Sequence, residues 1–168
     1  MTRCAVGVGS NIGDRFEHLR AAVDGLASVS RIVAESSVYE TAPIGGPDQG
    51  PFLNAVVVIE TARTPRGLLR ELLAIERSRG PVRDTRWGPR TLDLDLILSD
   101  RWSDSMPGLT GPHPRMLDRR FVLEPLLEAW PDAHMPDGTA IAPPSGAVAR
   151  QGLERVGAAV GGADGGGT

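Results

Sequence analysis

The sequence of 168 residues predicts an α+β fold, and three observations lead to this prediction. Apolar runs of β type and stretches of helical periodicity follow one another in the order strand, helix, strand, strand, helix, strand. Apolar residues make up 40% of the chain and charged residues 23%, as in globular domains. The 21 Gly and 14 Pro residues indicate long, shaped loops and disfavour a compact helical bundle. The element order is that of a ferredoxin-like unit, a mostly antiparallel sheet with helices packed on its faces.

The first half of the chain is expected to form three strands and one helix. Residues 4–8 are a short apolar run, typical of a strand, and a turn cluster follows it as far as Gly13. Asp14 with Glu17 three positions on is a capping box, which predicts that a helix begins here. The apolar stripe of this helix consists of Phe16, Leu19, Val23 and Leu26. Residues 31–41 and 52–61 predict the second and third strands, and a loop rich in Pro and Gly, residues 42–51, separates them.

The second half begins with a helix and ends in a less regular stretch. Thr64 as N-cap and Pro65 at the first helical position predict a helix that ends near residues 80–81. Its apolar stripe consists of Leu68, Leu69, Leu72, Leu73 and Ile75. A loop, 80–90, leads into a strand over 91–98, the clearest alternation in the chain. Residues 121–129 form an apolar segment, and 151–156 predict a weak helix. We expect one domain over residues 1–156 and a disordered Gly-rich tail over 157–168.

Composition excludes several classes of function. All 18 basic residues are Arg, so no lysine is available as a Schiff-base or Walker A residue. The net charge of −3 without a cationic block argues against nucleic-acid binding. The single cysteine and the scattered histidines show no zinc-ligand spacing. No apolar run approaches the ~18 residues of a membrane span, and we expect a cytoplasmic protein that does not bind membranes.

The strand over residues 91–98 carries a pair of carboxylates. The period of two places Leu92, Leu94, Leu96 and Leu98 on one face, and Asp93 and Asp95 together on the other. Their backbones are then about 6.6 Å apart, from a rise of ~3.3 Å per residue. Mg²⁺ that bridges carboxylates and substrate phosphates would relieve the repulsion between them. A solvated face of an edge strand explains the pattern equally well from spacing alone.

Arginines cluster directly before this pair, which points to a polyphosphate ligand. Arg77 and Arg79 are explained by the end of a helix, whereas Arg83 and Arg90 lie in the loop and favour a functional role. Trp87 in the same loop can close over a planar ligand. Phe52 and Phe121 fit either the core or a stacking role, and His113 between two prolines is more typical of an exposed loop than of a phosphate contact.

Five segments taken together resemble one enzyme family. They are the Gly9-Ser10-Asn11 turn, residues 37–45 (SVYETAPIG), residues 52–55 (FLNA), residues 86–95 (RWGPRTLDLD) and residues 112–116 (PHPRM). In collinear order over about residues 3–142, they resemble the 6-hydroxymethyl-7,8-dihydropterin pyrophosphokinases of folate biosynthesis. The string from Arg86 to Asp95 is the most specific of them.

The resemblance implies that ATP donates a pyrophosphoryl group to the hydroxymethyl oxygen of the reduced pterin and that AMP leaves. It implies two Mg²⁺ ions held by Asp93 and Asp95, with Arg83 and Arg90 as further catalytic residues. Pterin-binding residues would be Thr41, Pro43, Ile44, Phe52, Asn54, Trp87 and Phe121. Nucleotide-binding residues would be Glu76, Arg83, Trp87, Arg90, His113 and Arg119. The loops 42–51 and 80–90 would then act as lids.

Two other functions remain open from the residues alone. A kinase that transfers only the γ-phosphoryl group of ATP needs the same metal, carboxylates and arginines. A binding module that senses nucleotide without turnover is the other, although two carboxylates beside the arginines disfavour simple phosphate binding. The expectation is a monomer whose partners are small molecules, ATP and the reduced pterin.

Overall fold

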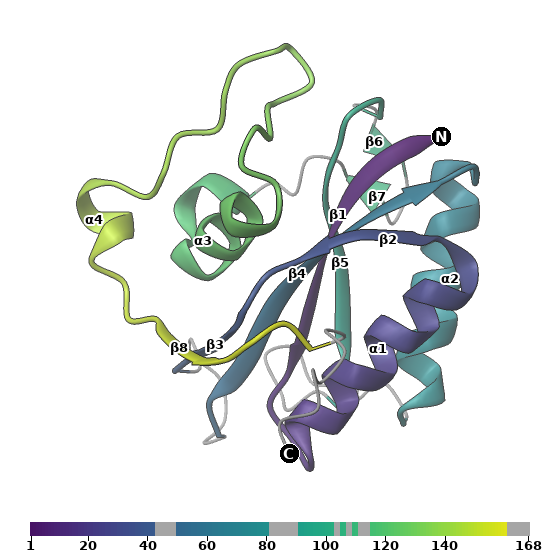
Figure 1. The fold of residues 1–168 in the computed structure, drawn as a ribbon, viewed down its shortest axis with the longest axis horizontal. Coiled ribbons are helices and arrows are strands. Elements are labelled where there is room, and N and C mark those ends of the chain that lie inside the picture. The colour runs from purple at the N-terminus through teal and green to yellow at the C-terminus, as the bar shows by residue number, and fades with distance from the viewer. Residues whose placement is uncertain (43–49, 81–90, 103–104, 107–108, 111–114, 161–168) are drawn as a thin grey trace, which may run out of the picture.

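The computed structural model of the chain describes residues 1–42, 50–80, 91–102, 105–106, 109–110 and 115–160. Their elements are β1 (Thr2–Ser10), α1 (Arg15–Val29), β2 (Arg31–Glu35), β3 (Val38–Thr41), β4 (Phe52–Thr61), α2 (Pro65–Ser78), β5 (Asp93–Ser99), β6 (Ser105–Met106), β7 (Leu109–Thr110), the 3₁₀ turn η1 (Met116–Asp118), α3 (Arg120–Ala129), α4 (Gly146–Ala149) and β8 (Glu154–Gly157). Figure 1 shows their arrangement.

The main sheet has the strand order β5-β1-β4-β3-β8, with β2 also paired to β4. Every pairing described in it is antiparallel. Strands β1 and β4 occupy the centre. Helix α1 connects β1 to β2, and α2 connects β4 to β5. This arrangement confirms the ferredoxin-like α+β prediction. Strands β6 and β7 form a separate small hairpin.

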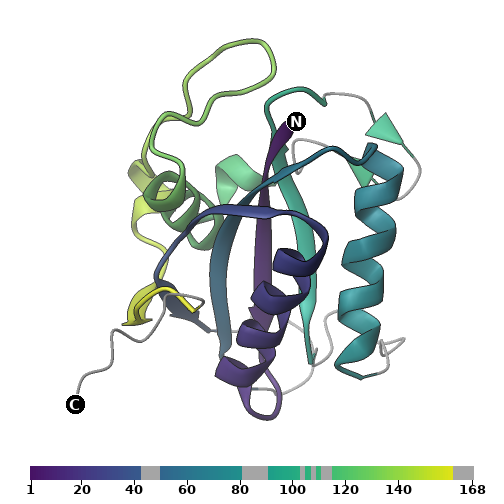
Figure 2. The same ribbon diagram turned by 45° about the vertical axis from the view of Figure 1, so that its right-hand side comes forward.

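Helices cover both faces of the sheet. In Figures 1 and 2, α1 and α2 lie together on one face and α3 lies on the opposite face. The core under α1 and α2 contains Val6 and Val8 of β1 together with Leu19, Leu26 and Leu72 of the helices. The core under α3 is separate and contains side chains from the sheet and from the helix: Ala5, Val56, Val58, Ile97, Val122, Leu123 and Leu126. The sequence left residues 121–129 unassigned, and they form most of α3.

The predicted helix starts are confirmed. The Asp14 carboxylate accepts a hydrogen bond from the Glu17 backbone N–H at 3.2 Å, and Thr64 Oγ1 accepts one from the Gly67 N–H at 3.1 Å. These bonds satisfy backbone donors that have no partner within the first turn of a helix. They explain why α1 and α2 begin where the capping residues predicted.

The predicted strand over residues 31–41 is two strands. Ser36 and Ser37 separate them, and the Ser36 hydroxyl accepts a hydrogen bond from the Val56 backbone N–H at 2.8 Å. Glu35 pairs with Val57 whereas Tyr39 pairs with Asn54, so this side of the ladder holds one extra residue. An unpaired extra residue of this kind bends a strand, as a β-bulge does.

Two further predictions need correction. The register of β1 with β5 shifts between Ala5 and Val6, so Leu98 joins Ile97 in the core under α3 instead of following the other leucines of its strand. The weak helix over residues 151–156 is wrong, because residues 154–157 form β8, which pairs with β3. Pairing with an existing strand satisfies backbone groups that a short isolated helix leaves exposed.

Candidate active site

The site begins with one row of residues across the sheet. Asp93 of β5 pairs with Gly9 of β1, Gly9 pairs with Asn54 of β4, and Asn54 pairs with Tyr39 of β3. Residues paired across strands point to the same side, so Asp93 and Asn54 share a face, with Gly9 between them. Two strand spacings of ~4.8 Å place their backbones about 10 Å apart. Gly9 puts no side chain between them.

The carboxylate pair lies on the same face as this row. Asp95 pairs with Gly7, just as Asp93 pairs with Gly9, so both carboxylates stand opposite glycines of β1. Asp95 is exposed and Asp93 is half-buried. This is also the face that α3 covers further along the strands, since Ala5 and Ile97 of its core continue the same alternation. The sequence prediction that the two carboxylates face the same way is therefore confirmed.

Two carboxylates side by side are hard oxygen ligands of the kind that Mg²⁺ prefers. Among the described residues, no group of three or more His, Cys, Asp or Glu side chains is suited to hold a metal ion. Mg²⁺ beside phosphates is usually bound by one or two carboxylates and completes its shell with water and substrate oxygens. The residues present fit that ion.

Glu76 of α2 supports the strand that carries the pair. Its carboxylate oxygen Oε1 accepts a hydrogen bond from the backbone N–H of Leu94 at 2.8 Å. Leu94 lies between the two aspartates, and β5 is the terminal strand of the sheet order. The carboxylate thus satisfies a backbone donor on the outer edge of β5 and fixes the strand between its two acidic residues.

The N-terminus of α3 brings a cation and a ring to the same region. The Arg119 guanidinium carbon lies 5.5 Å from the centre of the Phe121 ring, within the range of a cation–π contact. Burial lowers the pKa of the Arg119 guanidinium and repulsion by Arg115 adds to this, whereas attraction to Asp95 opposes it. Arg119 therefore contacts the Phe121 ring and is also in electrostatic reach of Asp95.

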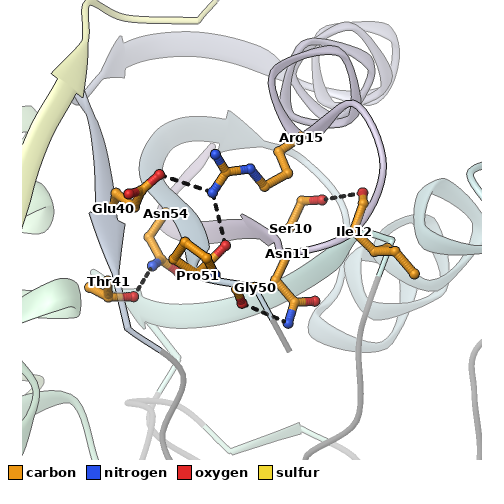
Figure 3. Close-up of polar contacts among 9 residues, drawn as sticks. All are labelled: Ser10, Asn11, Ile12, Arg15, Glu40, Thr41, Gly50, Pro51 and Asn54. Atoms are coloured by element: carbon orange, nitrogen blue, oxygen red, sulfur yellow. Dashed lines mark hydrogen bonds and ion pairs between the residues drawn. The ribbon is translucent and has the colours of Figure 1, made fainter. Parts of the chain in front are cut away.

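Side chains of β3 and β4 form one wall of the site. Asn54 Nδ2 donates a hydrogen bond to Thr41 Oγ1 at 2.9 Å (Figure 3). Thr41 pairs with Phe52, and alternation along β4 puts Phe52 on the same face as Asn54. All three side chains are half-buried. This wall offers an amide, a hydroxyl and an aromatic ring.

Sequence reasoning missed Arg15, which joins segments far apart in the chain. Its Nη1 donates to Glu40 Oε2 at 3.0 Å and to the Pro51 carbonyl at 2.9 Å (Figure 3). Asn11 Nδ2 donates to the Gly50 carbonyl at 3.5 Å in the same view. The turn between β1 and α1 therefore fastens the end of β3 to the start of β4. Asn11 could have been found from the Gly-Ser-Asn motif, but nothing near Arg15 in sequence signals its partners.

The remaining predicted site residues lie outside the described part of the chain. They are Pro43, Ile44, Arg83, Trp87, Arg90 and His113. Of the described candidates, Asp93, Asp95, Thr41, Phe52 and Asn54 share one face of the sheet. Burial raises the pKa of the Cys4 thiol to about 12, so this cysteine is not a nucleophile at neutral pH.

The fold and this face define a ferredoxin-like α+β protein with an acidic pair, an amide and an aromatic side chain on one face of its sheet, the face that α3 covers. The model of the 7,8-dihydro-6-hydroxymethylpterin-pyrophosphokinase (HPPK) family matches residues 5–131. The chain belongs to this family. It is accordingly a pyrophosphokinase, a diphosphotransferase.

Individual relatives agree with the family match. A 2-amino-4-hydroxy-6-hydroxymethyldihydropteridine pyrophosphokinase of Methylorubrum extorquens is 47% identical over 134 residues, which are 79% of this chain and 85% of the relative. A protein of the same name from Pseudomonas aeruginosa is 41% identical over 156 residues, 92% of this chain and 96% of the relative. No described helix is both long and apolar enough to cross a membrane.

Solved structures support the fold. The crystal structure of wild-type Plasmodium falciparum HPPK-DHPS with SDX-DHP matches with a TM-score of 0.63 at 14% identity. The match covers 83% of this chain but only 43% of that longer chain. At this identity the likeness concerns the fold alone.

Proposed function

We propose that this chain transfers the pyrophosphoryl group of ATP to the hydroxymethyl oxygen of 6-hydroxymethyl-7,8-dihydropterin and releases AMP, a step of folate biosynthesis. One observation carries the proposal: the acidic pair and the Asn54 amide share one sheet face, and Arg119, in contact with Phe121, interacts electrostatically with Asp95 of that pair. Family membership and the names of the relatives support the choice of substrates.

The pterin is proposed to bind between Phe52 and Phe121. A flat, electron-poor ring system gains most from stacking on aromatic side chains, and its polar edge needs an amide that both donates and accepts. Asn54 supplies that amide, and its bond to Thr41 holds it in one orientation. Family resemblance adds the backbone at Pro43 and Ile44.

The acidic pair is proposed to hold the metal and the phosphates. Asp93 and Asp95 would bind two Mg²⁺ ions, which when present neutralise the phosphate oxygens and polarise the attacked phosphorus. Arg119 adds a cation that cannot be deprotonated. Glu76 fixes the backbone between Asp93 and Asp95 by accepting a hydrogen bond from the Leu94 N–H.

Arg83, Trp87, Arg90 and His113 are assigned to the nucleotide by resemblance alone, with Trp87 also closing over the pterin. Two arginines from the loop 80–90 would add charge at the phosphates where the chain has no lysine. This loop and the loop 42–51 are proposed as lids that exclude water.

The reaction requires positioning more than covalent chemistry. The hydroxymethyl oxygen attacks the β-phosphorus and gives up its proton to water, while the bond from that phosphorus to the oxygen bridging the α-phosphate breaks, so that AMP leaves. The chain's own part is to stack and orient the pterin, to hold the phosphates in line, and to match the charge that builds on them. None of these tasks needs a nucleophilic side chain.

The chain is further proposed to act as a monomer in the cytoplasm on small-molecule partners, ATP and the reduced pterin. The single cysteine is buried and free, which is compatible with a reducing compartment. Residues 1–156 are proposed as a single domain and 157–168 as its tail, although Gly157, the first residue of that tail, is the last residue of β8 and pairs with Val38.

Replacing one acidic residue tests the proposed chemistry. Asp95→Asn should lower AMP formation at saturating Mg²⁺ by a factor of about 100 or more, because a charged metal ligand is lost. Asp24→Asn, on the exposed surface of α1, is the matched control and should keep wild-type activity. Phe121→Ala should chiefly raise the Kd for the pterin. A fully active Asp95→Asn enzyme would contradict the metal assignment.

A further inference from the structure

The segment that carries Arg119 and Phe121 begins without a local cap. Arg119 is both the C-cap of η1 and the N-cap of α3, and its side chain makes no capping hydrogen bond. The Arg119 carbonyl accepts the N–H groups of Val122 and Leu123, which leaves the N–H of Arg120 in need of another acceptor. A single residue thus joins two helical segments at the edge of the candidate site.

Gln151 supplies the missing cap from 31 residues further along the chain. Its Oε1 accepts the Arg120 backbone N–H at 2.9 Å, and its Nε2 donates to the Asp118 carbonyl at 2.9 Å. The Arg120 guanidinium donates in turn to the Gln151 carbonyl through Nη1 at 2.9 Å. One side-chain amide therefore bridges the two residues that flank Arg119.

Gln151 is itself held by the elements on either side of it. Val148 of α4 packs against the core under α3. Three residues after Gln151, β8 begins and pairs with β3, with Arg155 opposite Tyr39 and Glu154 opposite Glu40. Strand β3 ends at Thr41, in the wall that carries Asn54. The segment 148–157 thus connects the end of β3, where Thr41 lies, to the N-terminus of α3, where Phe121 lies.

We propose that Gln151 is a positioning residue for pterin binding: by bridging Asp118 and Arg120 it fixes the backbone at Arg119 and so the place of the Phe121 ring. The proposal rests on the pterin function proposed above. Residue 151 lies beyond the stretch matched by the family model, residues 5–131, so this support is provided from outside the segment that defines the family.

The effect should appear in binding more than in turnover. Without the bridge, the segment at Arg119 samples other conformations, and the apparent Kd rises by the inverse of the fraction that remains competent. Bound pterin draws the segment back, so the rate at saturation is retained. Losing the two side-chain hydrogen bonds, each worth about 1 kcal/mol or a factor of about 5, sets the scale at 5- to 30-fold in Kd.

The test compares Gln151→Ala with the wild type in steady-state assays with ATP, Mg²⁺ and the pterin. The expected result is a KM for the pterin raised about 5- to 30-fold with kcat within about 2-fold. Gln151→Glu keeps an acceptor for the Arg120 N–H and should recover part of the affinity. Amide hydrogen exchange at Arg120 should be faster in Gln151→Ala than in the wild type, a readout independent of activity.

Ile141→Val is the control, because it removes packing from the same core under α3 and lies outside the segment that holds Gln151. It should lower the melting temperature and leave the KM for the pterin unchanged. The proposal is overturned if Gln151→Ala has the wild-type KM, or if Ile141→Val raises KM as much. A wild-type enzyme that forms no AMP would instead refute the proposed function, whatever the variants do.

Discussion

Gly9 is the residue whose replacement tests the geometry of the site most sharply. A Cβ at Gly9 would stand 3.2 Å from Asn54 Oδ1 and 3.5 Å from the Leu53 carbonyl. Gly9 is not among the described glycines with positive φ, so its backbone accepts alanine without strain. The new methyl group therefore acts by moving the Asn54 amide a few tenths of an ångström and leaves the strand in place.

The displaced amide should cost affinity for the pterin. If Gly9→Ala disables one hydrogen bond between Asn54 and the ligand, the loss is about 1 kcal/mol, or about 5-fold in Kd. If both the donor and the acceptor of the amide are lost, the factor is about 30. The free energy of unfolding should change by no more than about 1 kcal/mol, the value of the Asn54–Thr41 bond.

A double-mutant cycle provides the assay. The Kd for the pterin is measured by fluorescence titration for the wild type, Gly9→Ala, Asn54→Ala and the double variant. Because the alanine acts through Asn54, it should have no further effect once Asn54 is already removed. Two independent factors that multiply in the double variant would refute the reasoning, as would an unchanged Kd for Gly9→Ala.

Gly25→Ala controls for a general loss of packing. A Cβ there would meet Ile75 Cγ1 at 2.9 Å, between α1 and α2 and on the other face of the sheet. This variant should change the free energy of unfolding and leave the Kd for the pterin as in the wild type. A matching rise in Kd would attribute the Gly9 effect to instability.

Two predictions concern stability. Thr64→Ala should lower the free energy of unfolding by about 1 kcal/mol, measured by urea denaturation, because the Gly67 N–H loses its acceptor. Burial acts to raise the pKa of Glu128, but hydrogen bonds from Ser37 and Tyr39 to its carboxylate outweigh it and hold that pKa below its ordinary value of 4.5. The stability from this carboxylate is therefore present above pH 4.5 and is lost as the pH falls through the lowered pKa. The advantage of the wild type over Glu128→Gln should shrink over that range, and a constant difference would contradict the carboxylate's role.

Local signals made much of the fold predictable. The caps at Asp14 and Thr64 determine where two helices begin, since the side chain and the N–H it binds are only three residues apart. The apolar run within residues 52–61 predicted β4 with its observed bounds. Such features depend on neighbours in sequence, and sequence patterns record them.

Other features depend on partners distant in the chain. Leu98 leaves the face of the other leucines because of a register shift opposite β1, which no pattern within β5 reveals. Residues 154–157 become a strand only because the edge of β3 is there to pair with. Pro125 lies inside α3 and weakens the helical signal of that segment, although packing against the sheet sustains the helix.

In the candidate site, too, some features follow from neighbours in sequence and others from residues distant in the chain. The motif around Asp93 and Asp95 identified the acidic pair, and alternation correctly predicted that both face one way. The partners of Arg15 and Gln151 lie 25 to 36 residues away along the chain, and tertiary structure alone brings them together.

The most direct test of the proposed activity is the identity of the nucleotide product. The purified protein is incubated with ATP, Mg²⁺ and 6-hydroxymethyl-7,8-dihydropterin, and the nucleotides are separated by chromatography. Pyrophosphoryl transfer predicts AMP in amounts equal to the pterin consumed, and none when the pterin is omitted. ADP as the product would mean transfer of the γ-phosphoryl group, and unchanged ATP would mean a nucleotide-binding protein without this activity; either result would contradict the proposed function.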